Sequence, residues 1–390
     1  MAAELFLTPD VDLEDQQVLG EVHAMREDLG VHLRVPRRWT GGLRLKTQAR
    51  AIQGSNSIEG YTVSDEDAIA AVDEDEPLTT DERTWAEIIG YRRVLTYVLH
   101  MAGDPDFRLD GHTLRSMHFM LLEHDMSKSP GQFRTGDIYV QTDDGHTVYQ
   151  GPDADAVPEL VDALGDYLRH SRLEGAEPMV RAAMAHLNLV MIHPYRDGNG
   201  RMARALQTLV MAQDAVLEPT FSSIEEWLGS NTEDYYRVLA ATGAGSWNPQ
   251  RNAHLWLKFN LRAHHIQAQT LTRRFADADR LAARVDEIVA RHGLPERTFD
   301  ALFDASIGLR VRRASYLRRA GVEDRTASRD LKALVDEGLL AAHGNTKARF
   351  YVPAGDIADL RDTTRLQRRR ITEPYPWLMG AVRAEASGSR

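Results

Sequence analysis

The sequence predicts a mainly α-helical protein whose helices are interrupted by one short β-hairpin. Apolar residues recur at three- and four-residue spacing, the period of a helix with one buried face, in four segments: 83–100, 110–125, 157–170 and 179–192. The stretch GDIYVQTDDGHTVYQGP (136–152) behaves differently, because Ile138 and Val140 alternate with other residues before an Asp-Asp-Gly turn. Alternation around such a turn predicts a hairpin.

Composition limits the class of protein. At 390 residues the chain is long enough for two or three domains, and 43% hydrophobic residues suffice to build their cores. The net charge of −11 argues against nucleic-acid binding by the protein as a whole but allows a local basic patch. The absence of cysteine excludes a disulfide framework and cysteine-ligated zinc. With no signal peptide and no apolar run of roughly 18 residues, we expect a soluble cytoplasmic protein without a membrane partner.

Changes in composition and hydrophobic pattern along the chain predict its domains. A composition break at GAGSWNP (243–249) precedes a helix at 253–275 that leads out of the main domain. Residues 310–352 predict a helix, a turn, a second helix and a short hairpin, whereas the chain after about Arg370 has no convincing period and is expected to be loose. We therefore expect an N-terminal helical region (1–100), a core domain (101–265), a C-terminal domain (278–355) and a tail (356–390).

The stretch HPYRDGNGR (193–201) concentrates unusual residues in one turn. Pro194 ends the helix 179–192, and RMARALQTLVMA then begins a strong helix with Arg201 in its opening turn. Free backbone N–H groups and the helix dipole attract anions at such an N-terminus. Gly198 and Gly200 let the backbone curl around Asn199 into a nest that suits phosphate oxygens.

The charged residues of this stretch extend the same interpretation. Arg201 and Arg204 lie three residues apart on one helix face, where two guanidinium groups can grip the outer phosphates of a nucleotide. Asp197 is then explained as a ligand of Mg²⁺ that bridges those phosphates, and His193 has the pKa range of a general base. The alternative is a polar turn in which His193 is a cap and the arginines are solvated. Any single residue fits that alternative, but the combination favours a nucleotide site.

These residues resemble a known family. HPYRDGNGRMAR closely resembles the Fic signature H-P-F-x-(D/E)-G-N-G-R-x-x-R, with Tyr195 in place of the usual Phe, and PGQFRTGDIYV with its hairpin resembles the Fic flap. The resemblance covers roughly 100–245 and makes 101–265 the catalytic core. It implies a helical fold and transfer of AMP from ATP to a Ser, Thr or Tyr hydroxyl of a target protein, whose segment the flap holds as an added strand.

The resemblance also implies a role for each residue of the motif. His193 is the base, and Asp197 is the magnesium ligand. The phosphates are held by the backbone of Gly198, Asn199 and Gly200, the Asn199 side chain, Arg201 and Arg204. In GSNTEDYYRVLAATGAG (229–245), Tyr235 and Tyr236 resemble a tyrosine pair that lines the adenine pocket, although Thr242 and Gly243 stand where the family often has Asn. The alternative is that both tyrosines pack on the core and rim of a helix.

A carboxylate upstream completes the resemblance. RLKTQARAIQGSNSI (44–58) can form a helix that ends at Glu59 and Gly60. A carboxylate at a helix C-terminus is unfavourable with the dipole, which suggests a cationic partner for Glu59. SNSIEG (55–60) resembles the Fic inhibitory motif (S/T)-x-x-x-E-(G/N), with Ser55 and Glu59 in register. The resemblance implies that Glu59 pairs with Arg204 and blocks productive placement of the γ-phosphate.

The C-terminal region carries a local positive charge. Residues 308–352 contain ten Lys and Arg against five Asp and Glu, and their pattern resembles a winged helix-turn-helix, which some Fic proteins carry at the C-terminus. A recognition helix beginning near Thr326 would direct four residues to a DNA major groove: Thr326, Ser328, Arg329 and Lys332. Lys347 and Arg349 would touch phosphate. The alternative is a module for protein contacts or dimerisation.

The sequence therefore predicts an autoinhibited protein adenylyltransferase that uses Mg²⁺ and ATP and modifies a target protein, with itself among the candidates. Two rivals stay open. One keeps the fold but removes AMP or transfers another nucleotide, and the other is a transcription regulator that senses a nucleotide. The sequence leaves the oligomeric state open.

Overall fold

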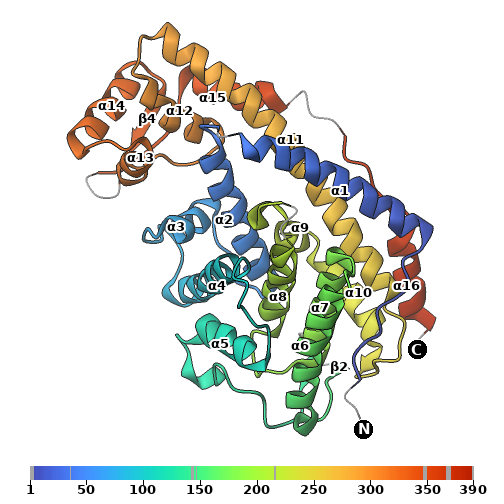
Figure 1. Cartoon of the computed structure of the whole chain (residues 1–390). Helices are drawn as coiled ribbons and strands as arrows, with labels where there is room; N and C mark the ends of the chain where they lie inside the picture. Colours follow the sequence, from blue (N-terminus) through green and yellow to red (C-terminus); the bar gives the residue numbers. More distant parts are fainter. Residues whose placement is uncertain are drawn as a thin grey trace.

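The computed structural model describes residues 4–35, 37–141, 145, 147–214, 217–345, 349–365 and 370–388. The predicted fold class is confirmed, because these residues form a mainly helical structure with a few short strands (Figure 1). In the described residues, six α-helices precede the central pair: α1 (Leu13–Arg34), α2 (Thr40–Ile58), α3 (Asp65–Asp73), α4 (Glu82–Met101), α5 (Gly111–Leu122) and α6 (Val157–Leu173). The central helices α7 (Pro178–Ile192) and α8 (Asn199–Gln213) follow, then the shorter α9 (Glu225–Ser230) and α10 (Thr232–Gly243).

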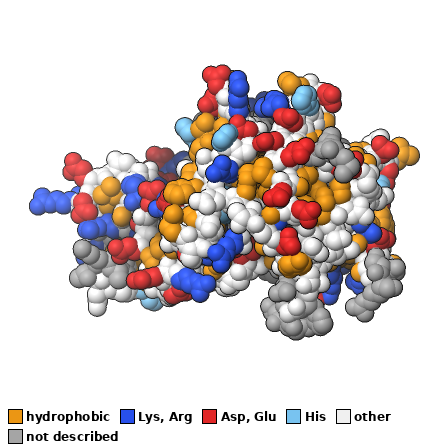
Figure 2. Space-filling view, turned by 90° about the horizontal axis from the view of Figure 1, so that it is seen from below, with side chains coloured by type: hydrophobic (Ala, Val, Ile, Leu, Met, Phe, Trp, Pro, Cys, Tyr) orange, Lys and Arg blue, Asp and Glu red, His pale blue; other side chains and the backbone are white. Residues whose placement is uncertain are grey.

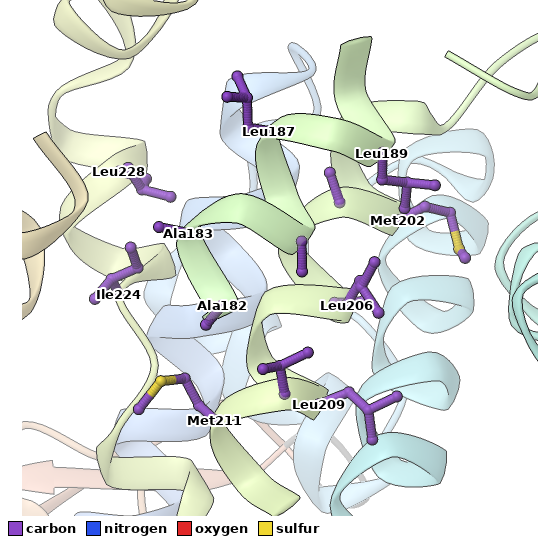
Figure 3. Packing of buried hydrophobic residues seen from close by; sticks show 14 of the residues in the cluster. Ala182, Ala183, Leu187, Leu189, Met202, Leu206, Leu209, Met211, Ile224 and Leu228 are labelled. Carbon is purple, nitrogen blue, oxygen red and sulfur yellow. The ribbon is translucent and has the colours of Figure 1, made fainter. Parts of the chain in front are cut away.

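Helices α7 and α8 form the centre of the core. Both are buried on nearly every side, as expected for helices that other helices surround. Figure 3 shows Leu189 of α7 beside Met202 of α8, and Ala183 of α7 beside Leu228 of α9. This packing holds the end of α7 and the start of α8, and thus the connecting loop 193–198, in a rigid frame.

Helix α2 is fixed against α9 by a very close approach. A Cβ atom added to Gly54 would lie 2.5 Å from the carbonyl oxygen of Glu225, so only a glycine permits this contact. The helix ends where the sequence predicts, with Glu59 as its C-cap and Gly60 directly after it. This arrangement carries the last turn of α2 to the side of α8.

The predicted hairpin is confirmed and belongs to a three-stranded sheet. Strand β1 (Tyr139–Gln141) pairs antiparallel with β2 (Thr147–Gln150), and β2 pairs parallel with β3 (Gly245–Ser246). The turn at 142–144 and residue 146 lie outside the described residues. The strand order is β1-β2-β3, so β1 is an edge strand.

The helix predicted at 253–275 is longer than expected. Helix α11 (His254–Arg291) has 38 residues and runs without interruption from the core to the C-terminal elements (Figure 1). The expected boundary at Ala278 lies inside this helix, so continuous helix joins the two regions there. A second apolar cluster strengthens the connection, because Trp39 packs edge-on against Phe275 with ring centroids 5.4 Å apart.

The C-terminal elements follow the predicted order of helix, turn, helix and hairpin. Helices α12 (Phe299–Ser306), α13 (Arg313–Ala320) and α14 (Asp324–Asp336) precede an antiparallel pair of strands, β4 (Leu340–His343) and β5 (Phe350–Pro353). Val311 adds one bridge to Tyr351 of β5. Helix α14 covers the helix expected near Thr326 and begins slightly before that residue.

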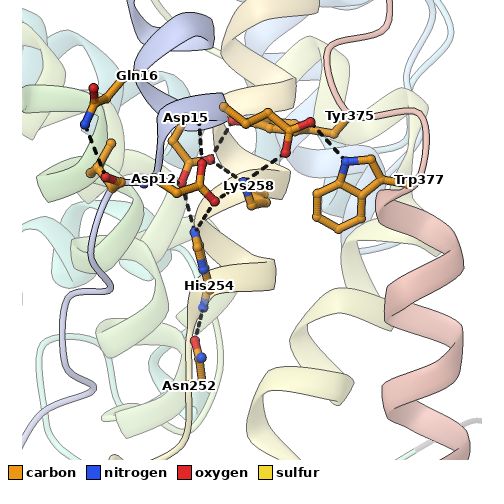
Figure 4. Close-up of polar contacts among 10 residues, drawn as sticks. Asp12, Asp15, Gln16, Asn252, His254, Lys258, Tyr375 and Trp377 are labelled. Atoms are coloured by element: carbon orange, nitrogen blue, oxygen red, sulfur yellow. Dashed lines mark hydrogen bonds and ion pairs between the residues drawn. The ribbon is translucent and has the colours of Figure 1, made fainter.

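The expectation of a loose tail after Arg370 is wrong. Helices α15 (Gly355–Arg365) and α16 (Leu378–Gly388) both form, and Tyr375 is buried. The Tyr375 hydroxyl donates a 2.8 Å hydrogen bond to Asp15, and Lys258 lies 2.8 Å from the same carboxylate (Figure 4). The Trp377 indole donates to Glu14 at 3.0 Å. The short segment has no clear period because contacts with α1 and α11, rather than an amphipathic repeat, hold it in place.

The surface is mixed in charge. On the face shown in Figure 2, acidic, basic and apolar side chains are interspersed. No helix that the structure describes is long and apolar enough to cross a lipid bilayer.

Candidate active site

His193 occupies the junction between α7 and the motif loop. It is the C-cap of α7 in the left-handed region with φ 51°, which turns its side chain away from the helix. Its Nδ1 lies 3.1 Å from the carbonyl oxygen of Val190, an acceptor, so Nδ1 carries the proton and Nε2 keeps a free lone pair. Burial lowers the pKa of His193, which favours the neutral imidazole. The residue therefore has the tautomer and protonation state of a general base.

The loop after His193 is shaped by its own side chains. The Asn199 amide accepts a 2.9 Å hydrogen bond from the Tyr195 N–H and donates a 2.8 Å bond to the Tyr195 carbonyl. Gly198 adopts φ 76°, which other residues rarely adopt. Both ends of the Asn199 amide are thus engaged inside the loop, and the second Nδ2 hydrogen is the one side-chain donor left for a phosphate. The expectation that this side chain helps to cradle phosphate stays a prediction.

Two residues that the sequence analysis did not single out hold this loop in place. His118 of α5 stacks on Tyr195 at 3.8 Å and accepts from Gly131 through Nδ1, so its Nε2 donates to the Asp197 carbonyl at 2.9 Å. Arg134 donates to the carbonyl of His193 at 2.9 Å and also binds the flap through the carbonyl at position 136, at 2.8 Å. Arg134 thereby ties the flap to the motif.

The predicted pairing of Glu59 with Arg204 is present. A Glu59 oxygen lies 2.7 Å from Nη2 of Arg204, whose side chain is fully buried. Ser55 holds the same guanidinium twice, through its hydroxyl at 2.7 Å from Nε and its carbonyl at 2.9 Å from Nη2. The Glu59 carboxylate also lies directly against Gly200. Ser55 and Glu59 thus engage Arg204 at the face of the loop where the sequence predicts phosphate binding.

Arg201 is held by a residue that the sequence did not reveal. Its Nη1 lies 2.5 Å from Glu87 of α4, and both side chains are almost fully buried. Lys128, in the turn Met126–Lys128 (η1) after α5, lies 2.6 Å from the other oxygen of Glu87 and 2.8 Å from Asp197. Burial raises the pKa of Glu87, but Arg201 and Lys128 more than offset it and lower the value to about 2. The carboxylate is ionised at neutral pH.

Nothing in the sequence points to this group. Glu87 stands alone in the helical pattern of α4, and Lys128 is one charged residue in a short polar turn. A single charged residue of this kind is more often solvated. Only the fold brings the pair beneath the motif.

The two predicted adenine-pocket tyrosines lie in different environments. Tyr235 is 1% exposed, and its hydroxyl lies 2.9 Å from Nε2 of the buried His186. Tyr236 is 46% exposed and donates a 3.0 Å hydrogen bond to the carbonyl of Ile58, beside Glu59. Tyr235 therefore packs in the core, as the alternative interpretation expected, and Tyr236 alone of the pair offers a surface next to the site.

The residues at the loop suit a magnesium ion that arrives with a nucleotide. Mg²⁺ usually keeps several waters and is bound by one or two carboxylates together with substrate phosphates. Asp197 supplies one such carboxylate: one oxygen accepts from the Gly198 N–H at 2.6 Å, and the other lies on Lys128. Burial raises the pKa of Asp197, but Lys128 lowers it further, so the group is ionised.

The predicted DNA-contact residues lie on α14. Arg329 and Lys332 are exposed, whereas Thr326 and Ser328 are both half-buried. Lys332 pairs with Asp336 on its own helix. Of the two residues expected to touch phosphate, 347 lies outside the described residues, and 349 is exposed just before β5.

Other arginines of the C-terminal elements face α3, the helix that follows the Glu59 segment. Arg310 lies 3.2 Å from Glu66, and Arg312 lies 3.2 Å from Asp75. Part of the positive charge found in the sequence is therefore already paired.

Fold and site together define a helical domain in which a glycine-containing loop joins α7, capped by His193, to the N-terminus of α8. Residues 108–211 match the model of the Fic/DOC family, so the chain carries a Fic domain. Similar curated proteins include protein adenylyltransferase fic-1 of Caenorhabditis elegans, 26% identical over 244 residues that cover 62% of this chain and 45% of that protein. Protein adenylyltransferase Fic of Nematostella vectensis is 25% identical over 247 residues, covering 62% of this chain and 54% of its own length. The chain spans about half the length of these relatives.

Solved structures show the same fold. A Fic family protein from Desulfovibrio desulfuricans G20 aligns with a TM-score of 0.56 and 22% identity, covering 90% of this chain and 98% of that one. Residues 134–508 of Fic-1 from C. elegans align with a TM-score of 0.53 and 22% identity, covering 66% of this chain and 71% of that one.

Proposed function

We propose that this chain is a protein adenylyltransferase, which transfers AMP from ATP to a Ser, Thr or Tyr hydroxyl of a target protein and is inhibited by Glu59. One observation carries the proposal. A neutral, correctly protonated His193, a glycine nest and two buried arginines converge on one loop. The similarity to curated adenylyltransferases supports the same reaction class.

His193 acts as the base in the proposed reaction. Its Nε2 takes the proton from the target hydroxyl while that oxygen attacks the α-phosphorus of ATP. The bond from the α-phosphorus to the bridging oxygen breaks, and pyrophosphate leaves in line with the attacking oxygen. Such transfers depend mainly on positioning and charge neutralisation, which agrees with a site that has one proton acceptor and several phosphate-binding groups.

The remaining motif residues hold the phosphates. The backbone N–H groups of 198–200 and the dipole of α8 face the α- and β-phosphates, and Arg204 and Arg201 hold the β- and γ-phosphates. Nη1 of Arg204 is buried and has no hydrogen-bond partner among the described residues, so it is available to a phosphate oxygen. Asp197 holds magnesium, which when bound neutralises charge on the phosphates.

The flap receives the target. Strand β1 lies at the edge of its sheet and offers unpaired backbone groups to an extended segment. Arg134 and the Tyr149 hydroxyl, which donates to the Met191 carbonyl at 2.7 Å, fix the flap to the end of α7. A target strand added to β1 is thereby brought to the histidine side of the loop.

Glu59 controls the reaction. Its carboxylate contacts the Arg204 guanidinium, which in this proposal binds the γ-phosphate. ATP therefore either loses that contact or binds with its α-phosphate turned away from the attacking hydroxyl. Release of α2 from this position would permit transfer.

Incubation of the protein with Mg²⁺ and ATP labelled at the α-phosphate tests the proposal. We expect label on the protein itself or on proteins of a lysate, and pyrophosphate in solution. Loss of AMP from a modified protein without new labelling would favour AMP removal, and label from another nucleotide would favour a different transfer. ATP binding without consumption, even in the Glu59→Gly variant, would favour a nucleotide sensor.

A further inference from the structure

Lys128 occupies an unusual position between two carboxylates of the site. Its Nζ lies 2.8 Å from one oxygen of Asp197 and 2.6 Å from one oxygen of Glu87, and its side chain is 15% exposed. Burial of a lysine is costly unless the ammonium is paired. Lys128 is therefore held where it is by these two acids.

Both oxygens of Asp197 have partners, and only one of these partners is a flexible side chain. Its other carboxylate oxygen accepts the 2.6 Å hydrogen bond from the Gly198 N–H, which belongs to the turn itself. The oxygen that Lys128 contacts is the one whose partner is a side chain that can move, so a divalent cation at Asp197 is expected to bind there. Two cations that share one oxygen repel each other, so the ammonium must withdraw.

Glu87 gives the displaced ammonium a place to remain. One oxygen of Glu87 faces Lys128 and accepts a 3.1 Å hydrogen bond from the Tyr61 hydroxyl, whereas the other oxygen binds Arg201. Lys128 can thus give up Asp197 and keep Glu87 without disturbing the salt bridge to Arg201.

We propose that Lys128 competes with the divalent cation for Asp197 and so sets how strongly nucleotide binding depends on metal. The inference rests on the proposed function, which assigns Asp197 to the metal. Without metal, Lys128 neutralises Asp197 and reduces its repulsion of the phosphates. With metal, the cation gains Asp197 only after one charge-assisted contact of Lys128 is lost.

The experiment measures the dissociation constant of ATP by calorimetry, in EDTA and in saturating Mg²⁺, with His193→Ala present throughout to prevent turnover. The dissociation constant in EDTA divided by the dissociation constant in Mg²⁺ measures the contribution of the metal to ATP binding. We expect Lys128→Met to raise this ratio at least roughly tenfold, because one charge-assisted hydrogen bond no longer opposes the metal. The change should come both from weaker ATP binding in EDTA and from stronger binding in Mg²⁺.

Control variants separate this effect from others. Lys128→Arg keeps the charge and should keep the ratio near that of the parent protein, as should Arg93→Met, which removes a surface cation paired with Glu123. Asp197→Asn should bring the ratio close to one whether residue 128 is Lys or Met. If Lys128→Met does not fold, as judged by thermal melting, Lys128→Gln replaces it.

Two results would overturn the inference. An unchanged ratio in Lys128→Met would mean that the lysine does not oppose the metal. Equal weakening of ATP binding with and without metal would make Lys128 a direct ligand of the phosphates. A failure of the parent protein to bind ATP at all would instead contradict the proposed function, so the two failures are distinguishable.

Discussion

Replacement of Glu59 by glycine is the most informative perturbation of this site. The substitution removes the carboxylate from Arg204 but leaves both contacts of Ser55 in place, so the guanidinium stays oriented. We expect AMP transfer to increase, including transfer to the protein itself. The reason is that Nη2 of Arg204 becomes available to the γ-phosphate, which lets the α-phosphate turn toward the attacking hydroxyl.

The size of the increase follows from the contact that is lost. A hydrogen bond to a charged group contributes about 1.5–3 kcal/mol, and the 26% exposure of the Glu59 side chain places this one in the lower half of that range. About 1.5–2 kcal/mol corresponds to a rate increase of roughly 10- to 30-fold. The melting temperature should fall by a few degrees at most, because Arg204 keeps both contacts with Ser55.

The assay compares the wild type with variants in α-labelled ATP and Mg²⁺, on the protein itself and on lysate proteins. Glu74→Gly is a matched control, because Glu74 caps the neighbouring helix α3 and pairs with Arg92 at the surface. Arg204→Ala should not reproduce the gain, since it removes the phosphate ligand together with the anchor of Glu59. The inhibition is refuted if Glu59→Gly is no more active than the wild type. If the double variant Glu59→Gly with His193→Ala keeps the gain, His193 is not the base.

The base and the C-terminal elements can be tested separately. His193→Ala should abolish AMP transfer but leave ATP binding within about twofold by calorimetry, since its ring accepts a proton and holds no phosphate; unchanged transfer would remove His193 from the chemistry. Burial lowers the pKa of His193 below its usual 6.5, so transfer should fall only on acidification below pH 6.5. The Glu59 carboxylate raises this pKa, so the acidic limb of the kcat/KM profile should move to lower pH in Glu59→Gly. A midpoint above 6.5 would contradict the assignment. The full chain should bind duplex DNA more weakly as salt rises. Neutralising Glu66 and Asp75 should increase the affinity for DNA, because it frees the arginines that these acids now pair with. No binding at low salt would assign the C-terminal elements to protein contacts.

The sequence was sufficient wherever a local pattern determines the structure. The apolar period predicts α4 to α7 closely, and the Asp-Asp-Gly turn predicts the flap. The motif places His193, Asp197 and the two arginines in one short segment, so their proximity needs no tertiary information. The link from Glu59 to Arg204 could be inferred only through the family resemblance, since the two residues lie 145 positions apart in the chain.

Other features depend on contacts that no local pattern contains. Glu87 and Lys128 meet the motif only because α4 and the turn after α5 pack beneath the loop. The bonds of the Asn199 side chain to Tyr195 exist only in the folded loop, so the sequence motif could not reveal them. The segment after Arg370 has too short a helix to show a period, and Tyr375 fixes it through a buried contact with α1.

The balance of charge explains why we assign the proposed inhibition to Glu59 rather than to another acid of the site. Three cations at the loop face three carboxylates: Arg201, Arg204 and Lys128 against Glu87, Glu59 and Asp197. Phosphates that enter this site must take over contacts that these acids now make.

The three acids differ in what their withdrawal would cost. Glu87 is 1% exposed within helix α4, and its withdrawal would remove the carboxylate from the buried Arg201. Asp197 is 38% exposed, but it is part of the motif turn and is held there by the Gly198 N–H. Glu59 binds one cation, is 26% exposed and lies at the end of its helix, where a small movement of the last turn removes it. Among the three acids, Glu59 is therefore the one that can leave at the lowest cost in free energy.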